Sequence, residues 1–242
     1  MRPLPAAATG RIEKSELSFK LQPSNFRLLV FDLDGTLVDS RTDLANATNA
    51  LIEALGARPL PDERIAQMVG EGAGVLVRRA LEAAGLDPAT PHALERFLQL
   101  YDARLLEHTR PYEGMTNALD RLAAAGLAMA VLTNKPSAAT LRLLDGLNLA
   151  RHFTAVLGGD AAFPRKPDPA GLLHLIDTGG ATPSTSLMVG DSRIDWETAR
   201  RAGVRVCLAR YGFGYRFDQS ELANEAMVID HPLQLADALG AP

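Results

Sequence analysis

Five short apolar runs limit the folds that this chain can adopt. Each run is almost continuously apolar rather than alternating, which is typical of strands that are buried on both faces. The runs cover residues 28–31, 128–132, 155–157, 187–189 and 204–208. Helical patterns lie between them, at residues 115–125, 137–147, 170–176 and 195–202. Alternating strands and helices predict an α/β fold, with a parallel sheet and helices on both of its faces.

The segment between the first two runs breaks this alternation. Residues 43–108 contain helical patterns and no convincing strand, so we predict a small all-helical domain inserted after the first strand. Its expected helices cover residues 44–55, 62–68, 75–84 and 92–108. The α/β core then consists of residues 25–42 and 109–242. Residues 1–24 are predicted to be a disordered extension.

Composition narrows the classes of protein to consider. The 242 residues are 47% hydrophobic and 22% charged, with a formal net charge of −4. These values are typical of a soluble globular protein, and the absence of a basic stripe argues against nucleic-acid binding. No stretch approaches the ~18 apolar residues of a membrane span. Cys207 is the single cysteine and can form no internal disulfide, which fits a reducing cytoplasm. We expect a cytoplasmic monomer or homodimer.

Polar residues follow three of the predicted strands at the point where each strand ends. Asp32 follows residues 28–31, Thr133 follows residues 128–132, and Asp191 follows residues 187–189. In open parallel sheets, ligands bind beyond the carboxyl ends of the strands. We therefore expect these side chains to converge on one crevice.

The first of these segments reads Asp32-Leu33-Asp34-Gly35-Thr36. Two carboxylates so close together repel each other, and a divalent cation relieves that repulsion. Oxygen ligands of this kind favour Mg²⁺, which also binds substrate phosphate. Gly35 allows a sharp turn, and Thr36 offers a hydroxyl and an N–H to a phosphoryl group. A plain turn with capping aspartates explains the segment equally well.

The other segments are also ambiguous when taken singly. Thr133 can bind a phosphate oxygen or simply cap a helix. Lys166, in a loop before a helix, can neutralise phosphate or lie on the solvated surface. Asp191 can complete a metal site or cap a helix, and Asp195 can orient its neighbours or bind a metal through water. Gly190 permits close approach of the backbone.

Taken together, the four segments resemble the four signature motifs of the haloacid dehalogenase superfamily. The resemblance extends from Phe26 to the C-terminus, and the Asp-Leu-Asp-Gly-Thr motif is specific for the phosphatase branch. It implies a Rossmann-like core and an aspartyl-phosphate formed on Asp32. Asp34 is implied as the general acid and base. The residues implied to hold the phosphoryl group are Thr133, Asn134 and Lys166. Mg²⁺ is implied to bind Asp32, the backbone carbonyl of Asp34, and Asp191. Ile194 stands where family members often carry Asn.

The helical insertion resembles the mobile cap of this superfamily. Gly70, Glu71 and Arg78 are the candidate substrate-binding residues of the cap, although Gly-rich loops also serve as plain connections and arginines are more often solvated. Further segments, including Tyr211-Gly212-Phe213-Gly214, are similar to those of phosphoglycolate phosphatases. The resemblance implies a small phosphorylated metabolite as substrate, with 2-phosphoglycolate favoured.

Several other functions remain open from the sequence. The alternatives within enzymes are a sugar phosphatase, a pyrophosphatase and a β-phosphoglucomutase, which keeps both motif-one aspartates. A different class is a catalytically silent binding protein on the same scaffold. Loss of Asp32, Lys166 or Asp191 would have favoured that class, and all three residues are present.

Overall fold

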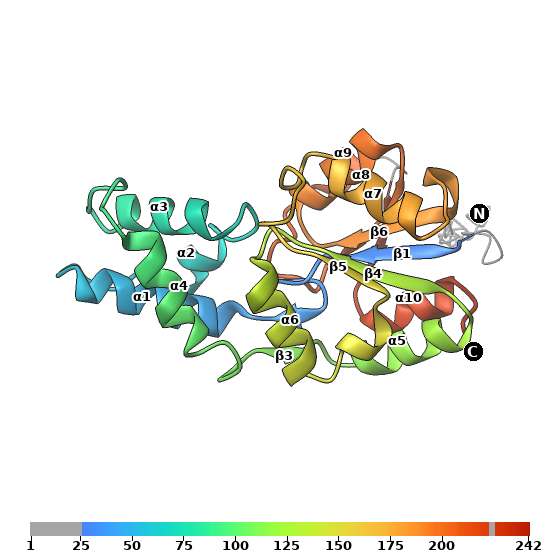
Figure 1. The fold of residues 1–242 in the computed structure, drawn as a ribbon, viewed down its shortest axis with the longest axis horizontal. Coiled ribbons are helices and arrows are strands. Elements are labelled where there is room, and N and C mark those ends of the chain that lie inside the picture. Colours follow the sequence, from blue (N-terminus) through green and yellow to red (C-terminus); the bar gives the residue numbers. More distant parts are fainter. Residues whose placement is uncertain (1–25, 223–225) are drawn as a thin grey trace, which may run out of the picture.

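A computed structural model describes residues 26–222 and 226–242 of the chain. A sheet with helices on both faces forms one part of the molecule, and a group of helices projects from one end of it (Figure 1). The predicted extension, residues 1–24, lies outside the described residues. In the described part of the chain, no helix is both long and apolar enough to cross a bilayer.

The main sheet has six parallel strands in the order β5-β4-β1-β6-β7-β8. These strands are β1 (Leu28–Phe31), β4 (Ala128–Leu132), β5 (Ala155–Leu157), β6 (Ser186–Gly190), β7 (Arg205–Ala209) and β8 (Ala226–Ile229). β1 lies at the centre, where Leu28 pairs in register with Ala128 on one side and Ser186 on the other. The predicted α/β fold is confirmed.

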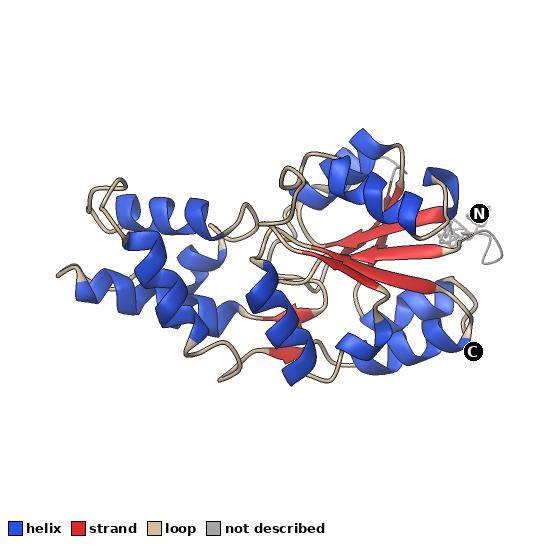
Figure 2. Cartoon of the chain, viewed as in Figure 1, coloured by secondary structure: helices blue, strands red, loops and turns tan. Residues whose placement is uncertain are grey.

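Both faces of the sheet are covered, which explains the continuous apolar runs. Leu29 and Phe31 of β1 belong to one hydrophobic cluster, and Leu28 and Val30 belong to the other. Helices cover the two faces in separate layers (Figure 2). One face carries α5 (Met115–Ala124), α6 (Ser137–Gly146) and α10 (Pro232–Ala238), and the other carries α7 (Ala170–Thr178), α8 (Arg193–Ala202) and the short α9 (Gln219–Leu222).

Strand β8 and helix α10 were not predicted. β8 is a run of four apolar residues at the edge of the sheet, and this run was not included among the predicted strands. Helix α10 begins with Pro232, whose fixed φ angle suits a first helical position, and the His231 side chain accepts a hydrogen bond from the Leu233 N–H. Two 3-10 turns, η2 (Ala150–His152) and η3 (Pro183–Thr185), complete the core.

Four helices form the projecting group. They are α1 (Arg41–Ala54), α2 (Asp62–Ala66), α3 (Ala73–Ala83) and α4 (Ala93–Asp102). Their buried side chains include Ile52, Ile65, Leu81 and Phe97, and α1 packs against the other three helices. We keep residues 43–108 as the proposed cap.

The predicted helix over residues 92–108 is too long. Helix α4 ends at Asp102, and residues 103–107 form turns. The chain leaves the helix because His108 and Thr109 hydrogen bond to Asp43 at the start of α1. Their N–H groups lie 2.7–3.0 Å from the Asp43 carboxylate oxygens, and the Thr109 hydroxyl donates to Oδ2 at 2.7 Å.

This Asp43 contact closes the junction through which the chain enters and leaves the helical group. Beside it, β2 (Val38–Asp39) pairs antiparallel with β3 (Arg110–Pro111), a ribbon that the sequence did not predict. Asp43 and Thr109 are both fully buried. The two connecting segments are therefore held together by a carboxylate and by paired backbone.

We expect Asp43→Ala to lower the free energy of unfolding by about 3 kcal/mol, because buried donors lose a charged acceptor. Chemical denaturation measures this change. Glu53→Ala, at an exposed position of the same helix, serves as the control and should change stability by less than about 0.5 kcal/mol. Equal effects of the two variants would contradict the importance of the Asp43 contact.

Candidate active site

The three predicted strand ends lie together at one edge of the sheet. Asp32 follows β1, Thr133 follows β4 and Asp191 follows β6, and these strands are direct neighbours. The Asp32 N–H donates to the Val189 carbonyl at 2.8 Å, and the Thr133 N–H donates to Leu157 at 3.0 Å. Continued strand pairing therefore fixes the backbone at the point where the polar side chains begin.

Lys166 joins two of the acidic side chains. Its ammonium lies 2.8 Å from Asp32 Oδ1 and 2.6 Å from Asp195 Oδ1, with only 2% of its side chain exposed. Burial alone would lower the pKa of Lys166, but Asp195 and Asp32 outweigh burial and raise it. The solvated-surface interpretation of this lysine is therefore excluded. Lys166 is a buried cation that holds one oxygen of Asp32.

Asp195 has a second role at the start of helix α8. Ser192 is the N-cap, and Asp195 Oδ2 accepts hydrogen bonds from the Ser192 N–H at 3.1 Å and from its hydroxyl at 2.6 Å. This reciprocal arrangement is a capping box with Asp in the third position. A Cβ on Gly190 would lie 2.3 Å from the Asp195 side chain, so the expected close approach occurs here. Asp195 therefore both caps the start of helix α8 and pairs with Lys166.

Asp191 lies within a shell of glycine backbone. Its Oδ2 accepts a hydrogen bond from the Gly214 N–H at 2.7 Å, and its Oδ1 accepts one from the Thr36 hydroxyl at 3.2 Å. Added Cβ atoms would lie 2.1 Å from its Oδ2 at Gly35 and 2.3 Å from its Cβ at Gly212. The close packing around this carboxylate explains why glycines occupy these positions. The Thr36 hydroxyl is directed to Asp191 here.

The carboxylates of Asp32, Asp191 and Asp195 come within 4.8 Å of one another, and all three are buried. Burial raises the pKa of Asp32 to about 6, with Lys166 opposing the shift and Asp195 adding to it. Burial, with Asp195 and Asp32 nearby, also raises the pKa of Asp191 well above its ordinary value. Crowded oxygen ligands of this kind fit a hard divalent cation, which would stabilise their ionised forms.

Asp34 faces away from this cluster and toward a second lysine. Lys135 Nζ lies 3.0 Å from both carboxylate oxygens of Asp34, and the Ser40 hydroxyl donates to Oδ1 at 2.6 Å. Lys135 also donates to the Tyr101 hydroxyl of helix α4 at 2.6 Å. Burial would lower the pKa of Lys135, but Asp34 and Tyr101 raise it. No separate role was predicted for Lys135, and no sequence pattern pointed to Ser40 or Tyr101.

Asn134 connects the helical group to the core. Its side-chain amide donates to the Gly70 carbonyl and to the Lys166 carbonyl, both at 3.0 Å, and its oxygen accepts from the Lys166 N–H at 2.9 Å. Thr133 is buried, and its hydroxyl accepts a hydrogen bond from the Lys135 N–H at 3.2 Å. Helix α6 begins only at Ser137, so Thr133 is not its cap. The amide of Asn134 therefore fixes both Gly70 and Lys166.

Two predicted cap residues lie apart from this assembly. Glu71 forms an ion pair with Arg79 at 2.5 Å, and 44% of its side chain is exposed. Arg78 is exposed as well. Neither Glu71 nor Arg78 lines the cleft described next. Their roles in substrate binding stay predictions.

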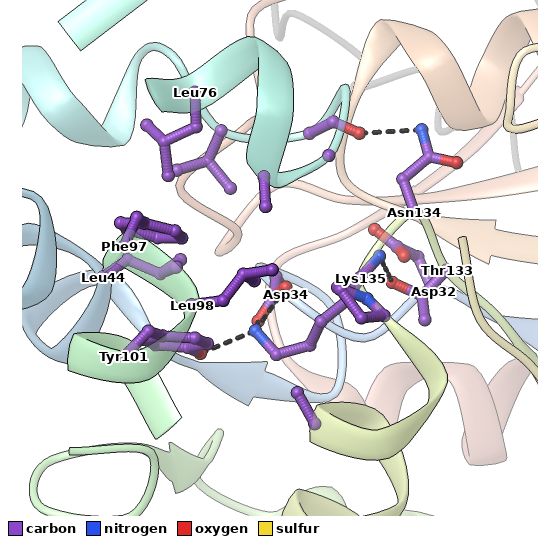
Figure 3. Close-up of a pocket in the computed structure, with 16 residues that line it drawn as sticks. Asp32, Asp34, Leu44, Leu76, Phe97, Leu98, Tyr101, Thr133, Asn134 and Lys135 are labelled. Atoms are coloured by element: carbon purple, nitrogen blue, oxygen red, sulfur yellow. Dashed lines mark hydrogen bonds and ion pairs between the residues drawn. The ribbon is translucent and has the colours of Figure 1, made fainter. Parts of the chain in front are cut away.

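A cleft between the helical group and the core brings the remaining residues together (Figure 3). It encloses about 560 Å³ of empty space, counted with its open mouth. Its core wall carries polar side chains, and its opposite wall is mainly apolar. The polar residues are Asp32, Asp34, Thr133, Asn134 and Lys135, and the apolar ones include Leu44, Val69, Leu76, Phe97 and Leu98. The cleft can hold a small molecule between a polar wall and an apolar wall.

Relatives and solved structures are similar to this chain over most of its length. A phosphoglycolate phosphatase of Pseudomonas fluorescens Pf0-1 is 43% identical over 195 residues, which are 78% of this chain and 71% of the relative. One from Rhodospirillum rubrum is 42% identical and covers 89% of this chain and 92% of its own. The crystal structure of a predicted phosphoglycolate phosphatase from Haemophilus somnus 129PT superposes with a TM-score of 0.81 at 29% identity, covering 88% of this chain and 98% of that one.

The family model described as haloacid dehalogenase-like hydrolase matches residues 29–209. That range includes β1, β4 and β6, whose ends carry Asp32, Thr133 and Asp191, and it also includes the loop of Lys166. Sequence, fold and site geometry agree, and the chain belongs to the haloacid dehalogenase-like hydrolases.

Proposed function

We propose that this protein hydrolyses a phosphomonoester through an aspartyl-phosphate on Asp32, converting 2-phosphoglycolate to glycolate and phosphate. The observation that carries the proposal is the position of Asp32. It lines the cleft, Lys166 holds one of its oxygens, and two other buried carboxylates lie beside it. A carboxylate held in this way suits nucleophilic attack on phosphorus.

The first step joins an Asp32 oxygen to phosphorus as the bond from phosphorus to the leaving oxygen breaks. The electron pair stays on the leaving oxygen, and Asp34 supplies its proton. In the second step a water oxygen bonds to phosphorus, Asp34 takes the proton of that water, and the bond to Asp32 breaks. Asp34 lines the same cleft and can serve both steps.

Lys166 and Thr133 are proposed to hold the transferring phosphoryl group, with Asn134 fixing the loop that carries Lys166. A Mg²⁺ bound by Asp32, Asp191 and the Asp34 backbone carbonyl would neutralise charge on the phosphoryl oxygens. Asp195 lies within the same acidic cluster, but its oxygens contact Lys166 and Ser192. We therefore assign Asp195 to positioning Lys166.

The choice of 2-phosphoglycolate rests on the relatives. The two relatives described above are phosphoglycolate phosphatases and are 42–43% identical to this chain. A panel of phosphate esters with and without Mg²⁺ tests the choice, and it should include 2-phosphoglycolate, sugar phosphates and pyrophosphate. We expect 2-phosphoglycolate to give the highest kcat/KM. Activity on none of them, with folded protein and metal present, would contradict the proposed reaction.

We expect Asp32→Asn to lower kcat by at least about 1,000-fold, because the amide is a poor nucleophile and the neutral side chain a weak metal ligand. Steady-state phosphate release measures the loss. Asp145→Asn, at an exposed position of helix α6, is the control and should keep wild-type kcat. Full activity in a folded Asp32→Asn variant would exclude Asp32 as the nucleophile.

We also expect Gly212→Ala to weaken Mg²⁺ activation. The added Cβ would lie 2.3 Å from both the Asp191 Cβ and the Gly35 carbonyl oxygen, so the packing of the backbone around Asp191 must shift. The Mg²⁺ concentration for half-maximal activity should rise about 10-fold. Gly180→Ala is the control. Its alanine would adopt a strained positive φ, but the added Cβ would meet no atom within 4 Å. An unchanged Mg²⁺ requirement in Gly212→Ala would argue against Asp191 as a ligand.

A further inference from the structure

The charge of the cleft is distributed unevenly. Among the described residues that line it, Lys135 alone carries a positive charge. Asp32 and Asp34 are acidic, and the wall formed by the helical group is largely apolar. Lys135, which is already paired with Asp34, is therefore the one lining cation that a second anionic group on a bound ester could contact.

Lys135 is a rigidly held cation. Its side chain is 3% exposed, and its ammonium contacts Asp34 on the core and the Tyr101 hydroxyl on helix α4. The ammonium also lies 4.4 Å from the centre of the Tyr101 ring, and that ring stacks on Phe97. Figure 3 shows Lys135 reaching between Asp34 and Tyr101 at the boundary of the two walls. Its position is fixed before any ligand arrives.

We propose that Lys135 and Tyr101 bind the carboxylate of a short phosphorylated hydroxy acid and so select acids over sugars. This assignment rests on the proposed function and names the residues that would give that function its specificity. It differs from the prediction that Arg78, an exposed residue, takes part in substrate binding.

Substrate chemistry places the carboxylate near Lys135. In 2-phosphoglycolate, one methylene separates the carboxylate from the ester oxygen that leaves. That oxygen must approach Asp34 to receive a proton, so the carboxylate must lie close to Asp34 as well. Lys135 contacts both oxygens of Asp34 at 3.0 Å and is therefore within reach. Arg78 is exposed and lies outside the cleft.

Tyr101 supports the same contact. Its hydroxyl oxygen accepts the hydrogen bond from Lys135, which leaves its own hydrogen free to donate to a carboxylate. Burial raises the pKa of Tyr101 to about 12, so the hydroxyl keeps that hydrogen near neutral pH. Lys135 and Tyr101 together would give a carboxylate a charged and a neutral donor.

The apolar wall disfavours sugars. Leu44, Leu76, Phe97 and Leu98 offer no hydrogen bonds to the hydroxyl groups of a sugar phosphate. A hydroxyl buried against such side chains loses its hydrogen bonds to water without replacement. A short acid avoids this cost, because its polar atoms are confined to the phosphate and the carboxylate.

The test compares kcat/KM for two esters of nearly the same shape: 2-phosphoglycolate and carbamoylmethyl phosphate, in which a neutral amide replaces the carboxylate and an NH₂ donor replaces one acceptor oxygen. Loss of a buried charged partner should lower the acid-to-amide ratio about 100-fold in Lys135→Gln. Loss of one hydrogen bond to a charged group should lower it about 10-fold in Tyr101→Phe, mainly through KM for the acid. Any general damage to Asp34 affects both esters and cancels in the ratio.

Arg96→Gln is the matched control, because Arg96 is exposed on the helix that carries Tyr101 and lies outside the cleft. It should keep the wild-type ratio. A wild-type ratio in folded Lys135→Gln and Tyr101→Phe would overturn the assignment. If Lys135→Gln is inactive on both esters, the acid-to-amide ratio of Tyr101→Phe decides, and a wild-type ratio in that variant overturns the assignment. A fall of the acid-to-amide ratio in Arg78→Gln as large as that in Lys135→Gln would also overturn the assignment.

The same experiment separates this assignment from the proposed function. A wild-type enzyme that hydrolyses neither ester contradicts the proposed function and this assignment with it. A wild-type enzyme that hydrolyses 2-phosphoglycolate, with a ratio insensitive to Lys135→Gln and Tyr101→Phe, contradicts this assignment alone. Thermal unfolding of every variant verifies that the fold is retained.

Discussion

The contact between buried Lys166 and the carboxylates of Asp32 and Asp195 is the interaction on which the site depends. Burying carboxylates is costly unless they are paired or bind a cation. Lys166 offsets part of this cost, but burial, together with the neighbouring carboxylates, keeps the pKa values of Asp32 and Asp191 raised. The close-packed backbone at Gly190 and Gly212 follows from the same crowding, because side chains there would displace the carboxylates. A divalent cation would complete the charge balance.

The helical group contributes to the site without supplying any of the three clustered carboxylates. Gly70 accepts a hydrogen bond from Asn134, and Tyr101 accepts one from Lys135. Asn134 in turn hydrogen bonds to the backbone of Lys166. Since Asn134 and Lys135 are adjacent, this one loop links the helical group to both Lys135 and Lys166. Asp43 holds the junction at the other end of the group. The cleft therefore lies between the two parts, and its shape depends on how the helical group is positioned against the core.

The sequence predicted the parts of the site that follow from strand order. Asp32, Thr133 and Asp191 each come directly after an apolar run, and in parallel neighbouring strands those positions must converge. Lys135 and Tyr101 could not be assigned in the same way, because their contact joins residues 34 positions apart and has no local pattern. The expected helix over residues 92–108 failed for a similar reason. Its end is set by hydrogen bonds from His108 and Thr109 to Asp43, across 65 and 66 positions of sequence.

The most direct test of the account is chemical trapping of the phosphorylated side chain. Enzyme, Mg²⁺ and 2-phosphoglycolate are mixed and quenched rapidly, borohydride reduces any acyl phosphate, and mass spectrometry locates the reduced residue. The account predicts reduction at Asp32, and only when both Mg²⁺ and the ester are present. Reduction at Asp34 or at any other residue, with Asp32 unmodified, would contradict Asp32 as the nucleophile.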